Sequence, residues 1–159
     1  MTSAVVLAMA LALRAGADDD QPRSEPTDSP GKSTKQKENR EMKIRLEVGD
    51  QTITATLLDS AAARDFASLL PLMLRMNDHF GREKYGHLPR AISEGGQRTH
   101  TYDVGQIAYW PPGRDVAVFY RHDGQSIPAP GIIVLGTVDA GVMGLAFRGS
   151  MNVTFEHAE

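Results

Sequence analysis

The strongest constraint on the fold is a two-residue alternation of apolar and polar side chains that starts near residue 42. In "MKIRLEV", Ile44, Leu46 and Val48 alternate with charged residues. Such alternation is typical of a β-strand with one buried face. After a Gly-Asp turn, "QTITATLL" alternates in the same way, and two strands joined by so short a turn form an antiparallel hairpin. The folded part of the chain therefore begins as a β-sheet.

The segments that follow extend this pattern to the end of the chain. Short strands are predicted at "LMLRM", "QIAYW", "DVAVFY", "IIVLGTV" and "MNVTFEH". The stretch "DSAAARDFASLLP" predicts a short helix that starts at Asp59 or Ser60 and stops at Pro71, and "DAGVMGLAF" predicts a second. About seven short strands with regular turns favour a mainly β fold, a closed β-barrel with two short helices that cap its ends.

The first 17 residues, "MTSAVVLAMALALRAGA", are predicted to be a signal peptide that ends in a small-residue cleavage site. Their apolar run is shorter than the roughly 20 residues that a transmembrane helix needs, so no stable membrane span is expected. On this interpretation the protein is secreted or periplasmic. Alternatively, translation starts at Met42 and the protein is cytoplasmic.

Residues 18–41 differ sharply in composition from the rest of the chain. They contain no aromatic or aliphatic side chain and are rich in Pro, Ser, Lys, Asp and Glu. Such a segment buries too little apolar surface to offset the entropy of ordering it. We therefore expect a disordered polar linker over residues 18–41 and one folded domain over residues 42–159.

Composition and motifs exclude several classes of protein. The chain has no cysteine, so it has neither disulfides nor thiolate metal sites. Its net charge is −3 and the folded domain has no cluster of Lys and Arg, which argues against a nucleic-acid partner. The five histidines lack metal-ligand spacing. No serine-nucleophile elbow or phosphate-binding glycine motif is present. We expect no metal and no cofactor.

Three segments, in the same order along the chain, resemble cyclophilin segments. The stretch "LLDSAAARDFASLL", with its Asp65-Phe66 pair, is similar to the cyclophilin strand end and first helix. The stretch "VGQIAYWPPGRDVAVFY" is similar to a later hairpin, and "IIVLGTVDAGVMGLA" to a valine-rich strand and a Gly-led helix. The chain most resembles the small bacterial cyclophilin-like proteins. The resemblance implies a cyclophilin-like barrel and, as an activity, peptidyl-prolyl cis/trans isomerisation.

The chemistry of that activity indicates which side chain to seek. Rotation about an X-Pro bond faces a barrier of about 18–20 kcal/mol. An isomerase lowers it by holding the proline ring in an apolar pocket and donating a hydrogen bond to the twisted amide. Arginine suits this role because it is always charged and holds its donors in a planar fork. In "HLPR", Arg90 stands at the place comparable to the cyclophilin arginine. A surface arginine beside a turn is the alternative interpretation.

Other side chains complete the predicted substrate site. Phe119, Tyr109 and Met76 are the expected apolar wall. Gln97, in "EGGQ", stands for the glutamine that the resemblance implies. Because neighbouring strand residues face opposite sides, one of Phe119 and Tyr120 is expected in the core and the other in the groove.

Two charged residues near these segments have more than one interpretation. Arg121 ends the strand "AVFYR" and is a second candidate donor to the substrate. A salt bridge to Asp123 or Asp115 explains it equally well. Asp65 is expected either to remain a solvated helix charge or to pair with a nearby arginine, Arg64 or Arg90.

Two functional hypotheses follow. The first is a prolyl isomerase or folding helper that acts on proline-containing segments. The second is a non-catalytic module on the same barrel that binds a peptide or a small ligand. The residues alone leave both open.

Overall fold

The computed structural model describes residues 41–159. The predicted signal peptide over 1–17 lies outside the described residues, as does the predicted linker over 18–41 except for Glu41. The domain predicted over 42–159 contains a single antiparallel sheet that closes on itself.

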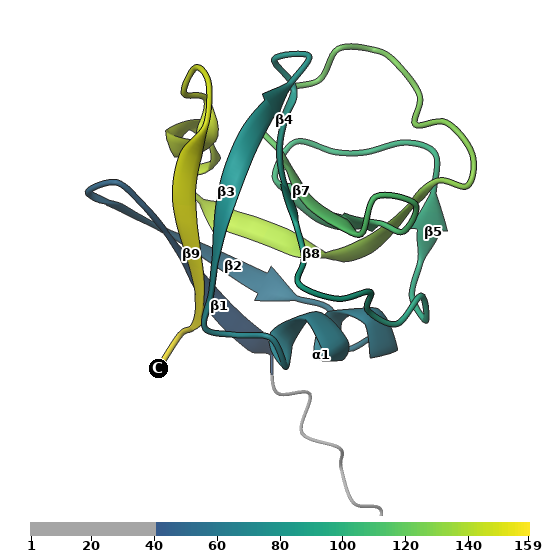
Figure 1. The fold of residues 1–159 in the computed structure, drawn as a ribbon, viewed down its shortest axis with the longest axis horizontal. Coiled ribbons are helices and arrows are strands. Elements are labelled where there is room, and N and C mark those ends of the chain that lie inside the picture. The colour runs from purple at the N-terminus through teal and green to yellow at the C-terminus, as the bar shows by residue number, and fades with distance from the viewer. Residues whose placement is uncertain (1–40) are drawn as a thin grey trace, which may run out of the picture. The chain divides into compact units, whose positions relative to one another are not determined.

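Nine strands, one α-helix and one 3₁₀ turn make up this domain. Their bounds are β1 (Met42–Val48), β2 (Gln51–Leu57), α1 (Ala61–Ala67), β3 (Leu72–His79), β4 (Glu83–His87), β5 (Arg98–Thr99), β6 (Gln106–Trp110), β7 (Asp115–Phe119), β8 (Ile132–Ala140), η1 (Val142–Leu145) and β9 (Met151–His157). Figure 1 shows the strands wrapped into a barrel. No helix in this part of the chain is long and apolar enough to cross a bilayer.

Eight strands close the barrel in the order β1-β9-β3-β4-β7-β6-β8-β2, and β2 pairs with β1. The short β5 pairs only with the beginning of β8. At Gly136, β8 pairs with both β2 and β6. A Cβ atom there would lie 2.3 Å from the backbone oxygen of Thr56, so the close approach of the strands requires glycine. The predicted closed β-barrel is thus confirmed.

Apolar side chains on the inward faces of the strands fill the barrel. Burial of each large side chain contributes about 1.5–3 kcal/mol, and the alternation seen in the sequence is what directs these residues inward. The largest inward side chains are Ile44, Leu46, Ile53, Leu57, Met76, Ile107, Tyr109, Val118, Ile133, Leu135 and Phe155.

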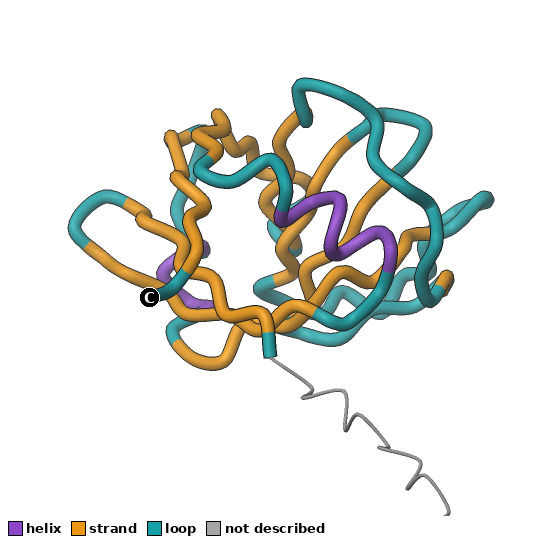
Figure 2. The backbone as a smooth tube through the Cα atoms, turned by 90° about the horizontal axis from the view of Figure 1, so that it is seen from below, coloured by secondary structure: helices purple, strands orange, loops and turns teal. Residues whose placement is uncertain are grey.

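The helix α1 lies across one end of the ring of strands (Figure 2). Its N-cap is Ser60, whose hydroxyl oxygen accepts a hydrogen bond from the N–H of Ala63 at 3.1 Å, as helix-capping serines do. Phe66 is fully buried and meets Phe155 edge to face at 5.7 Å between ring centres. This contact fastens the helix to the barrel.

The second predicted helix is shorter than expected. The segment "DAGVMGLAF" forms only the four-residue 3₁₀ turn η1, so the domain has one α-helix. Gly141 precedes this turn and offers no side-chain cap, and Gly144 lies within it. Glycine disfavours helix by about 1 kcal/mol relative to alanine, which explains why no α-helix extends from this point.

Candidate functional site

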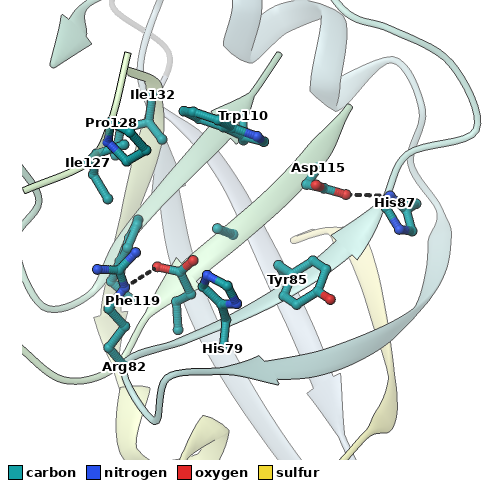
Figure 3. A pocket seen from close by; sticks show the side chains of 12 residues that line it. His79, Arg82, Tyr85, His87, Trp110, Asp115, Phe119, Ile127, Pro128 and Ile132 are labelled. Atoms are coloured by element: carbon teal, nitrogen blue, oxygen red, sulfur yellow. Dashed lines mark hydrogen bonds and ion pairs between the residues drawn. The ribbon is translucent and has the colours of Figure 1, made fainter. Parts of the chain in front are cut away.

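A hollow of about 380 Å³ lies on the outer face of the barrel, over strands β4, β7 and β6. We call it the outer pocket (Figure 3). Its apolar lining consists of Tyr85, Trp110, Ala117, Phe119, Ile127, Pro128 and Ile132. Its polar lining consists of His79, Arg82, Glu83, His87 and Asp115.

Small side chains on two paired strands create the hollow. Ala108 on β6 pairs with Ala117 on β7, and both are buried on the outer face of the sheet. Phe119 lies two residues beyond Ala117, and Tyr102 stacks on its ring at 4.2 Å between centres. Trp110 lies across the pocket from Phe119 (Figure 3). Ala117 therefore forms a floor between two aromatic walls.

A buried cation closes one end of the outer pocket. The side chain of Arg82 is only 7% exposed, and its Nε donates a hydrogen bond to Oε2 of Glu83 at 2.9 Å. Its Nη1 donates to Asp123 at 3.3 Å, and the guanidinium lies 5.4 Å from the centre of the Tyr102 ring. Burial raises the pKa of Glu83 despite the nearby arginine. Two of the five N–H donors of Arg82 are therefore engaged with carboxylates.

A carboxylate and a histidine form the other end of the outer pocket. Oδ1 of Asp115 lies 2.5 Å from Nδ1 of His87, as the dashed line in Figure 3 marks. This oxygen is buried and accepts no hydrogen bond of good geometry from the described residues. Burial raises the pKa of Asp115, although His87 opposes the effect. This end of the pocket is therefore lined by a carboxylate whose Oδ1 faces His87 and is closed off from solvent.

The predicted substrate residues do not come together. Phe119 lines the outer pocket as expected. Tyr109 and Met76 face the barrel interior, where they are 1% and 0% exposed. Gln97 is exposed, and its backbone oxygen accepts a hydrogen bond from the N–H of Val134 at 2.9 Å. Arg121 lies at the end of the barrel, away from the outer pocket lining. Their binding roles stay predictions.

Phe119 and Tyr120 face opposite sides of the sheet, as strand alternation predicts. Phe119 belongs to the outer cluster, whereas Tyr120 packs with the barrel interior. The neighbouring Arg121 makes no ion pair with Asp123 or Asp115 in the described structure. Instead, Asp123 pairs with Arg82.

Arg90 lies in the loop after β4 and outside the outer pocket. Its Nη2 donates hydrogen bonds to Oδ1 of Asp65 at 2.6 Å and to Oγ of Ser68 at 3.0 Å. The hydrogen bond from Arg90 is the main reason why the pKa of Asp65 is lowered. Of the two arginines predicted as partners of Asp65, Arg90 is the one that forms the ion pair. The observed contacts are structural, and the catalytic role of Arg90 stays a prediction.

We expect Arg90→Ala to lower the thermal midpoint by no more than a few degrees, because an ion pair with exposed partners contributes little. Asp65→Ala is expected to have the larger effect, since that carboxylate also accepts a hydrogen bond from the N–H of Ser93 at 2.7 Å. Thermal unfolding followed by circular dichroism measures both variants. A larger loss for Arg90→Ala than for Asp65→Ala would contradict this ranking.

No strand was predicted at the position of β4, which supplies much of the pocket. In β4, the outward residues are Glu83, Tyr85 and His87, while Lys84 and Gly86 face inward. The usual apolar alternation is therefore absent. A Cβ atom at Gly86 would lie 2.9 Å from Sδ of Met76, which explains the glycine. The only sequence pattern that marks β4 is the placement of large polar or aromatic residues at every second position, Glu83, Tyr85 and His87.

No three His, Cys, Asp or Glu side chains within residues 41–159 gather closely enough to hold a metal ion.

The model of the Cyclophilin-like family matches residues 46–156. No curated protein matches the chain. Among solved structures, the chain is similar to the solution structure of the hypothetical protein AF2241 from Archaeoglobus fulgidus. The TM-score is 0.60 at 22% identity, over 74% of this chain and 95% of that chain.

The structural similarity supports the fold, and the sequence match is more specific. The family model begins within β1 and ends within β9, so it covers nearly the whole barrel. It also covers every residue that lines the outer pocket. Because this match extends over more than half of the chain, the protein belongs to the Cyclophilin-like family.

Proposed function

We propose that the domain is a non-catalytic binding module whose outer pocket holds a ring-bearing peptide segment or small ligand. The observation that carries this proposal is the aromatic-walled hollow of about 380 Å³. Pockets for small molecules have volumes of about 300–1,000 Å³ and combine apolar walls with a few polar groups. The outer pocket has both properties.

The two aromatic walls favour a flat or compact ring over an extended polar chain. A ring between Trp110 and Phe119 would rest on Ala117, a small floor residue fixed by strand pairing. Aromatic contacts of this kind contribute about 0.5–1.5 kcal/mol beyond the buried area. A proline ring or an aromatic ring in the ligand satisfies this geometry.

The polar ends of the outer pocket favour a ligand with a hydrogen-bond donor. The carboxylate of Asp115 lines one end of the pocket, and a hydrogen-bond donor on the ligand, an N–H or O–H group, is favoured beside it. At the other end, Arg82 already donates to Glu83 and Asp123. A guanidinium whose charge is offset by two carboxylates is a weaker donor to a twisted prolyl amide, which favours binding over catalysis.

Filling the floor tests the proposal. We expect Ala117→Leu to weaken ligand binding at least about tenfold, because the added side chain occupies the space for the ring. Trp110 is the only tryptophan of the chain and lines the pocket, so its fluorescence reports binding directly. The probes are blocked N-acetyl-Xaa-Pro amides, with Xaa varied, and pyrrole as a proline-free ring with an N–H donor that does not interfere with tryptophan fluorescence.

The matched control is Ala91→Leu, which adds the same atoms at an exposed position outside the pocket lining. It is expected to bind like the unaltered protein. Equal binding by Ala117→Leu, with folding verified by circular dichroism, would place the ligand elsewhere. Absence of any Trp110 response to either probe class would remove the support for this ligand chemistry.

Membership of the Cyclophilin-like family also supports a second candidate function, prolyl isomerisation. NMR exchange spectroscopy on the same proline peptides separates the two functions, because a binding module leaves the cis/trans exchange rate nearly unchanged. Acceleration that Arg90→Ala abolishes would overturn the non-catalytic proposal and support the catalytic role predicted for Arg90.

A further inference from the structure

We propose that a second site, at one end of the barrel, binds a phosphate dianion between Arg121 and Arg148. A hollow of about 250 Å³ lies there, and we call it the barrel-end site. The residues that define it are Asp78, Gly81, Tyr120, Arg121, Ala146, Phe147 and Arg148. None of them lines the outer pocket, so this inference is independent of the proposed function.

The barrel-end site is formed by three segments that are distant in sequence. They are the turn between β3 and β4, the residues directly after β7, and the segment between η1 and β9. Figure 1 shows the β3–β4 turn at the end of the barrel opposite α1.

A buried lysine holds one wall in place. Lys84 is fully buried, and its Nζ donates a hydrogen bond to Oδ1 of Asp78 at 2.8 Å. The same ammonium also donates to the backbone oxygen of Phe147 and lies 4.0 Å from the centre of the Phe147 ring. Arg148 directly follows Phe147, so Lys84 fixes the backbone that carries Arg148 at the rim.

The carboxylate of Asp78 holds the other two walls. The hydroxyl of Tyr120 donates to Oδ1 of Asp78 at 2.5 Å, and the N–H of Gly81 donates to Oδ2 at 3.0 Å. Arg121 directly follows Tyr120 and is thereby placed near the β3–β4 turn. A Cβ atom on Gly81 would lie 3.9 Å from Nη1 of Arg121. This is an ordinary contact distance, so the guanidinium lies beside the β3–β4 turn.

The charges of the barrel-end site do not balance. Asp78 offsets the charge of Lys84 through their direct ion pair. The side chains of Arg121 and Arg148 make no hydrogen bond or ion pair with any described residue, and both residues are exposed. Two positive charges therefore flank one hollow without a counter-charge from residues 41–159.

Two guanidinium groups suit a phosphate monoester in charge and geometry. Such a group carries a charge of about −1.5 to −2 near neutral pH, which matches two arginines, whereas a carboxylate would neutralise only one. Each arginine presents a planar fork of donors that pairs with two phosphate oxygens. The ligand class is thus inorganic phosphate or a small phosphate monoester.

Titration of the ¹⁵N-labelled 159-residue chain with inorganic phosphate, at constant ionic strength, tests the inference. We expect the amide signals of Gly81, Arg121 and Arg148 to shift together and to saturate. Sulfate, also a tetrahedral dianion, is expected to give the same pattern, and acetate is not. Arg121→Gln and Arg148→Gln are each expected to weaken phosphate binding about tenfold, since a hydrogen bond to a charged group is lost.

The matched control is Arg64→Gln, which removes the same charge from α1, at the other end of the barrel (Figure 1). It is expected to bind phosphate like the unaltered chain. A parallel titration with glycerol phosphate distinguishes the ligand sources, because tighter binding than inorganic phosphate indicates an organic monoester. Equal weakening by all three variants, or equal shifts with acetate, would overturn the site.

Discussion

Lys84→Met is expected to destabilise the barrel by about 3 kcal/mol, the lower end of the cost of breaking a buried ion pair. Methionine keeps most of the apolar stem but leaves Asp78 without its counter-charge. The lower end applies because the side chain of Asp78 is 29% exposed and retains contact with water. The backbone oxygen of Phe147 also loses its donor. Urea unfolding at neutral pH measures the loss.

Two further variants make this expectation specific. Asp78→Asn combined with Lys84→Met removes both charges and is expected to recover part of the stability, because no isolated charge remains. Lys43→Met removes an exposed lysine and is expected to change stability little. A loss in Lys84→Met no greater than that in Lys43→Met would contradict the structural role assigned to Lys84.

The second large effect is expected at alkaline pH. Burial and the hydrogen bond to Asp78 raise the pKa of Tyr120 from 10.0 to about 12. In the unfolded chain Tyr120 loses its proton near pH 10, whereas in the folded protein it retains it. The unfolded state then binds fewer protons, so stability falls as pH rises. A difference of about 2 pKa units corresponds to a loss of about 2–3 kcal/mol between pH 10 and pH 12.

Tyr120→Phe isolates this contribution from the titration of other groups. Below pH 10 the variant is expected to be less stable than the unaltered protein, because Asp78 loses a donor. As pH rises towards 12, the difference between the two proteins is expected to shrink by about 2–3 kcal/mol. Urea unfolding at a series of pH values measures it. Parallel stability curves over this range would show that Tyr120 titrates normally.

The barrel was predictable because most of its strands bury one apolar face. The first hairpin was predicted from alternation alone, and it forms β1 and β2. Strands β6 to β9 coincide with apolar segments that are bounded by turn residues. The length of η1 could not be predicted in the same way. Its segment has two glycines, and a single 3₁₀ turn is enough to form the backbone hydrogen bonds there.

The candidate sites were less predictable, because they depend on residues that break this pattern. Lys84 occupies an inward position that a periodicity argument assigns to an apolar side chain. Tyr109 and Met76 were predicted to form an apolar wall, yet apolar character alone does not tell a pocket from a core. Strand alternation separates Phe119 from Tyr120, but it does not decide which of the two faces outward.

Strand β4 serves both sites from opposite faces. Glu83, Tyr85 and His87 line the outer pocket, and Lys84 supports the barrel-end site from within. Because side chains alternate strictly along a strand, a shift of the pairing by one residue would send every one of them to the wrong face. The two sites therefore depend on the same strand register. A one-residue shift of β4 would disrupt both sites at once.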